Sequence, residues 1–82
     1  MSALPSPFTS RLGLAEIHMA RGRPAQAEPL LRQAVAVRRA GLTADHPDLA
    51  EALRRLGACL TALGRRAAAD SLLAEADRIS SR

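Results

Sequence analysis

The side chains that could support catalysis or metal binding are few in this sequence. Cys59 is the sole cysteine, and His18 and His46 are the two histidines. These residues do not have the spacing of a metal site, and no serine has an evident base near it. No glycine-rich loop opens a helix in a phosphate-binding arrangement. We therefore predict a protein that is not an enzyme and that has no cofactor and no metal ion.

Arginine supplies the remaining chemistry. The 12 basic residues are all arginine, against 8 acidic residues, and the formal charge is +4. A guanidinium fork suits a carboxylate or a phosphate, so the pair Arg54-Arg55 could bind an anionic partner. Glu51 stands four residues before Arg55, however, and an ordinary intrahelical ion pair on a solvated face explains the same residues. Both interpretations stay open from the sequence.

Binding to nucleic acid is the alternative function that the arginine content suggests. Phe8 is the one aromatic residue, so a single strand would find no stacking platform. The acidic residues also interrupt the basic surface. We therefore rank an arginine-rich nucleic-acid-binding module below a module that binds protein.

Length and composition limit the architecture to one domain, residues 1–82. The chain is 48% hydrophobic and 24% charged, which is a globular profile. A lone cysteine cannot form an internal disulfide, and no apolar run is long enough to span a bilayer. The first residues carry neither a basic nor an apolar segment. We expect a soluble cytoplasmic protein that does not contact a membrane.

The chain repeats itself at an offset of 42 residues. Between residues 5 and 40 this offset gives ten identities in 36 pairs, among them Gly22 with Gly64 and Pro5 with Pro47. Most identities fall on small or apolar positions, where packing sets the choice of residue. We predict a first repeat at about residues 5–41, a second at about residues 46–80, and a flexible N-terminus at residues 1–4.

Each repeat has the pattern of two helices joined by a short turn. Apolar residues recur at three- and four-residue spacing, and glycine and proline mark the ends. The pattern predicts helices from between residues 5 and 10 to 21, then over about 24–40, 47–63 and 65–80. Gly22 and Gly64 should turn the chain between antiparallel helices, and Pro29 should kink the second helix. The predicted fold is all-α, with two tandem helix hairpins.

The residues of the second repeat resemble the tetratricopeptide repeat family. Small and large residues follow the order of that family, namely Leu56-Gly57, Leu60, Gly64, Ala69, Leu73 and Ala76. The period of 42 exceeds the usual length of about 34 residues. This longer period and the sequence of residues 42–50 resemble the longer repeat of kinesin light chains and their bacterial relatives. The resemblance implies an α-solenoid fragment that acts as a protein–protein interaction scaffold.

The resemblance also implies a concave groove lined by the first helix of each hairpin. A partner peptide or helix would bind there, and the arginines would suit an acidic one. Arg54-Arg55 stands where these longer repeats often have an asparagine pair. The implied groove residues are Glu16, Met19, Glu51, Arg54, Arg55, Ala58 and Thr61, with Thr9, Leu12 and Gly13 beside them.

Cys59 and the two histidines have structural interpretations within this arrangement. Cys59 aligns with Ile17 and is expected to be a small core residue. His18 takes a place usually held by a packing aromatic side chain, and His46 is expected to support the turn before Pro47.

Two repeats are fewer than such arrays normally need. About three are required for stability, and terminal repeats usually present a polar outer face. The last predicted helix still carries Leu72, Leu73 and Ile79 with no helix after it. We therefore expect the chain to self-associate through its terminal helix faces or to be a fragment of a longer array.

Overall fold

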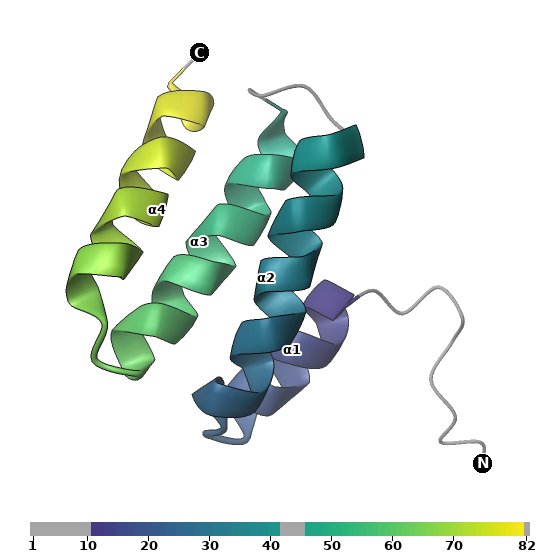
Figure 1. Cartoon of the computed structure of the whole chain (residues 1–82), viewed down its shortest axis with the longest axis vertical. Helices are drawn as coiled ribbons and strands as arrows, with labels where there is room; N and C mark the ends of the chain where they lie inside the picture. The colour runs from purple at the N-terminus through teal and green to yellow at the C-terminus, as the bar shows by residue number, and fades with distance from the viewer. Residues whose placement is uncertain (1–10, 42–45, 82) are drawn as a thin grey trace.

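The computed structural model describes residues 11–41 and 46–81 as four helices and no strand. They are α1 (Arg11–Ala20), α2 (Pro24–Gly41), α3 (Pro47–Ala62) and α4 (Arg66–Ser80). Figure 1 shows α1 and α2 as one hairpin and α3 and α4 as a second, with α3 lying between α2 and α4. The all-α prediction of two tandem hairpins is confirmed. The predicted N-terminus at 1–4 and the start of the first repeat lie outside the described residues.

The two hairpin turns have the same geometry, as the 42-residue offset predicts. Gly22 and Gly64 both adopt positive φ, 71° and 81°, which glycine tolerates without steric cost. In each turn the residue after the glycine donates its N–H to a carbonyl five residues earlier. These bonds join Arg23 to His18 and Arg65 to Leu60, both at 2.8 Å. Such bonds satisfy carbonyls at the helix end, so glycine closes both helices in the same way.

His46 caps the start of α3 and supports the turn before Pro47, as its position suggested. Its Nδ1 atom accepts a hydrogen bond from the backbone N–H of Asp48 at 3.1 Å. Pro47 follows in the first turn, where its missing N–H costs no helical hydrogen bond. Asp48 adds a negative charge near the positive end of the helix.

The core is built around α3, because α2 and α4 pack against it from two sides. Leu49, Leu53 and Leu60 are among the largest fully buried side chains. Alanines at 27, 52, 69 and 76 are fully or almost fully buried beside them, which lets the helices approach closely. No described residue with a polar or charged side chain is buried.

Gly57 marks the closest approach of α3 to α4. A Cβ atom at this position would lie 2.9 Å from Cγ and 2.8 Å from Cδ2 of Leu73. A glycine therefore fits this crossing without displacing Leu73. The tetratricopeptide pattern predicts a small residue here, and the counterpart of Gly57 in the first repeat is Ala15.

Three large apolar residues of the first hairpin are exposed rather than buried. They are Leu14 and Ile17 on α1 and Val37 on α2. The α2 helix also runs without interruption through Pro29 and includes Gly41, which the sequence placed just beyond its end. Among the helices that the structure describes, none is long and apolar enough to cross a membrane.

Candidate functional site

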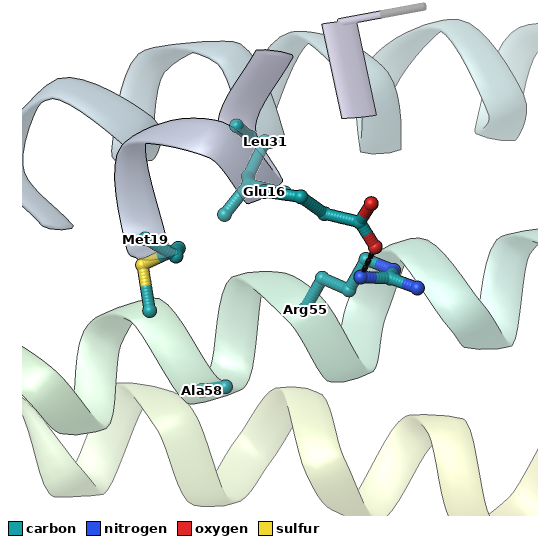
Figure 2. Close-up of a pocket in the computed structure, with 6 residues that line it drawn as sticks. Glu16, Met19, Leu31, Arg55 and Ala58 are labelled. Atoms are coloured by element: carbon teal, nitrogen blue, oxygen red, sulfur yellow. Dashed lines mark ion pairs between the residues drawn. The ribbon is translucent and has the colours of Figure 1, made fainter. Parts of the chain in front are cut away.

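A pocket of about 300 Å³ lies between the first helices of the two hairpins. Ala15, Glu16 and Met19 reach it from α1, and Arg55 and Ala58 reach it from α3. Leu31 of α2 completes the lining. Figure 2 shows Glu16 and Arg55 pointing toward one another across the gap between α1 and α3, with Met19 and Ala58 beside them. We call this set of residues the α1–α3 pocket.

Helical spacing explains why these side chains meet. Ala15 and Met19 are four residues apart on α1, and Arg55 and Ala58 are three apart on α3, so each pair shares one helix face. Leu31 is 1% exposed and belongs to the hydrophobic core. The pocket floor is therefore part of the packed interior, and its shape depends on the packing of α1, α2 and α3.

Charge at the pocket rim is concentrated on Arg55. Its guanidinium group forms an ion pair with Glu16 of α1 and a second with Glu51 of its own helix, the latter at 3.1 Å. The Glu16 pair joins the two hairpins, and the Glu51 pair is the intrahelical contact that the sequence predicts. Two carboxylates thus surround one guanidinium group, so this rim is locally acidic although the chain is basic.

The structure brings together four of the predicted groove residues, Glu16, Met19, Arg55 and Ala58. Glu51 is not among the pocket-lining residues, but it forms an ion pair with Arg55. Arg54 points elsewhere and donates a hydrogen bond to the Ser80 hydroxyl on α4.

Three further described residues of the expected groove do not line the pocket, namely Leu12, Gly13 and Thr61. Thr61 donates its hydroxyl to the Gly57 carbonyl at 2.9 Å. Leu12 is buried in the core, which corrects its expected place on the groove face. Thr9 lies outside the described residues.

Two pocket residues were absent from the sequence-based set, namely Ala15 and Leu31. A signal for Ala15 was available, because its counterpart Gly57 also stands at a close helix crossing. Leu31 is a buried apolar residue of α2. Its contribution to a pocket depends on the placement of α3, which the repeat pattern alone does not give.

Cys59 is a core residue, as its alignment with Ile17 predicted. It is 0% exposed, and its thiol donates to the Pro24 carbonyl at 3.1 Å. Burial raises the pKa of Cys59, with a further increase from nearby Glu28. A raised pKa keeps the thiol protonated, and this lowers its nucleophilicity.

The histidines take no part in the α1–α3 pocket. Apart from capping α3, His46 lies 4.0 Å from the Asp48 carboxylate. The Nδ1 atom of His18 is buried without a hydrogen-bond partner in the part of the chain that the structure describes. Within residues 11–41 and 46–81, no group of three or more acidic, histidine or cysteine side chains is placed to hold a metal ion.

Many of the arginines are engaged within the fold. Glu28 of α2 pairs with Arg65 at 2.9 Å, which joins the first hairpin to the second, and with Arg32 at 2.8 Å. Arg39 pairs with Glu75 at 2.8 Å, and Arg38 donates to the backbone carbonyl of Asp48. These contacts direct much of the basic charge toward internal partners.

The chain folds as two stacked helix hairpins with matching glycine turns, and a pocket lies between their first helices. This arrangement defines a helical-repeat protein of the α-solenoid class. A family model described as tetratricopeptide repeat matches residues 7–80. The chain therefore belongs to the tetratricopeptide repeat family, whose members generally mediate contacts between proteins. The resemblance to the kinesin-light-chain type of repeat stays a prediction. No curated protein matches the chain. No solved structure matches it either.

Proposed function

We propose that this chain binds a peptide or helix of another protein across α1 and α3, with an apolar side chain of the partner in the α1–α3 pocket. The observation that carries the proposal is the pocket itself, whose walls from Ala15, Met19, Leu31 and Ala58 are apolar. A small apolar cavity with a few polar groups at its edge is the usual form of an anchor site.

The rim charges bear on the kind of partner. Arg55 already has two carboxylate neighbours, so an acidic peptide would compete with Glu16 and Glu51 for the guanidinium group. A partner donor, such as a backbone N–H or a basic side chain, can instead bind the free oxygens of these carboxylates. Apolar burial is therefore the main attraction at this site, and binding of an acidic partner is one outcome of the test below.

A non-catalytic role in the cytoplasm is part of this proposal. The buried Cys59 and the capping role of His46 leave these two side chains without a position for catalysis at the pocket. Nucleic acid stays the second candidate, favoured by the formal charge of +4. A mobility shift with generic DNA or RNA across a salt series tests it, since phosphate binding weakens steeply with salt.

Selection from a displayed random-peptide library tests the proposed function. The selected peptides should share an apolar residue at one position. Their affinity should fall about tenfold or more for Ala58→Arg, because a charged side chain then occupies an apolar site. Ala68→Arg is the matched control, since Ala68 is an exposed alanine on α4 away from the pocket.

The Arg55→Ala variant separates the two kinds of partner. Loss of binding in this variant, with acidic residues recurring in the selected peptides, would support recognition of an acidic peptide. Unchanged binding in this variant would support the apolar anchor alone. Equal binding to wild type and Ala58→Arg would contradict the proposal.

A further inference from the structure

The two repeats differ in how well the outer face of the first helix is covered. Ile17 on α1 and Cys59 on α3 are counterparts at the 42-residue offset, yet Ile17 is 48% exposed and Cys59 is 0% exposed. Leu14 and Leu56 are also counterparts, at 36% and 3% exposed. The difference arises because α2 packs against α3, whereas no described helix takes the same place against α1.

The α2–α3 contact shows which kind of surface covers this face. The Pro24 carbonyl at the start of α2 accepts from the Cys59 thiol, and Glu28 of α2 pairs with Arg65 in the turn after α3. Leu31 supplies buried apolar area at the same contact. An equivalent cover for α1 needs an acidic residue opposite Arg23, which is the counterpart of Arg65.

The α4 helix carries the matching features. Asp70 is the counterpart of Glu28, and Leu73 is the counterpart of Leu31. Leu73 is only half-buried, because no helix follows α4 within the described residues. Asp70 and Arg23 are both exposed. Within the described residues, neither forms an ion pair or a side-chain hydrogen bond. The two ends of the molecule thus repeat the charge pattern of its internal hairpin interface.

We infer that two copies of this chain associate head to tail, with α4 of one copy packing against the Leu14 and Ile17 face of α1 in the next. In this arrangement Asp70 pairs with Arg23 of the neighbouring copy, as Glu28 pairs with Arg65 within the chain. The same operation can be applied again, so the contact is heterologous and generates an open, growing array rather than a closed dimer.

One residue of α4 differs in character from its counterpart in α2, and this difference limits the strength of the contact between copies. Asp77 is the counterpart of Val35, which is buried in the core. A charged side chain at this place gives the α4 face less apolar area than the α2 face that it mirrors. Association between copies is therefore weaker than the internal packing and sensitive to protein concentration.

Sedimentation velocity of the full chain over a wide concentration range tests the inference. Wild type should show a weight-average mass that rises continuously beyond a dimer. Ile17→Arg should weaken association about tenfold or more, because it places a charge in the apolar contact. Asp77→Val should strengthen association. Circular dichroism at low concentration checks that each variant keeps its helices, which is expected because these positions are exposed.

The charge pair provides the most specific readout. Asp70→Arg and Arg23→Asp should each weaken association about fivefold, because each places like charges opposite one another. The double variant should return the association between copies to near the wild-type strength. Arg78→Asp is the matched control, since its counterpart Ala36 is exposed and lies away from the internal interface.

Three results would overturn the inference. The first is a monomer at every concentration, which would leave the face to a hairpin of a different chain or of a longer one. The second is a mass that stops at two copies and responds to Ile17→Arg but not to Asp70→Arg, which would indicate a symmetric contact of α1 with α1. The third is weakening by both charge variants without recovery in the double variant.

Discussion

Arg39 of α2 and Glu75 of α4 form a two-pronged ion pair, with guanidinium-to-carboxylate distances of 2.9 Å and 2.8 Å. The pair joins the second helices of the two hairpins, and the two residues are 36 apart in sequence. A parallel pair of charge-assisted hydrogen bonds holds both side chains in one geometry. This contact therefore adds a specific polar link between the hairpins beside their apolar packing.

Glu75→Gln should lower the free energy of unfolding by about 0.5–1 kcal/mol, because both groups are partly exposed to solvent. Chemical denaturation at low and high salt measures the effect, and high salt should reduce it. Glu51→Gln is the control, since it removes an intrahelical pair of about 0.2–0.5 kcal/mol. A larger loss for Glu51→Gln would argue against the structural role of the Arg39 pair.

Gly57→Val should destabilise the fold by about 1–3 kcal/mol, because any side chain here must displace Leu73 from its place against α3. Thermal unfolding followed by circular dichroism gives the difference. Ala74→Val on the exposed side of α4 should cost only about 0.5 kcal/mol in helix propensity. Equal losses for the two variants would mean that α3 and α4 do not cross closely at Gly57.

Cys59 should react slowly with thiol reagents in the folded protein. Its side chain is buried, and its raised pKa leaves little thiolate at neutral pH. Because the folded pKa lies above the unfolded value, the stability linked to this thiol is complete at neutral pH. It is lost as the pH rises through the folded pKa.

Reaction with a chromogenic disulfide measures the reactivity of Cys59, and denaturant should accelerate it strongly. The control is Ala58→Cys combined with Cys59→Ala, which moves the thiol to an exposed neighbouring position and should react rapidly without denaturant. Rapid reaction of native wild type would place Cys59 outside the core.

His46→Ala should lower the free energy of unfolding by about 1 kcal/mol, since the N–H of Asp48 then loses its side-chain acceptor at the start of α3. Urea unfolding is a suitable measurement. His46→Asn supplies another capping acceptor and should keep most of the stability. If the asparagine variant is as unstable as the alanine variant, the cap is not what His46 contributes.

The sequence was sufficient for the features that depend on local geometry. Gly22 and Gly64 could be assigned to turns because a positive φ strongly favours glycine, and the structure places both there. The Glu51–Arg55 contact followed from helical spacing alone. The place of His46 before Pro47 predicted a supporting role at this turn, and the structure adds the hydrogen bond by which His46 caps α3.

Features that depend on neighbouring helices could not be obtained in this way. Leu12 and Arg54 are counterparts in the repeat, yet Leu12 is buried and Arg54 turns to Ser80 on α4. Ile17 and Cys59 occupy the same place in the pattern, but only Cys59 has a helix over it. A periodic pattern treats all repeats alike, whereas the two ends of a short array have different surroundings.

The direct test of the account is a nuclear magnetic resonance titration with a peptide selected for binding. The account predicts that the largest shift changes occur at Met19 and Ala58 in the α1–α3 pocket, with little change at Ala36 and Ala74 on the exposed sides of α2 and α4. The opposite distribution, with changes concentrated on α2 and α4, would contradict it.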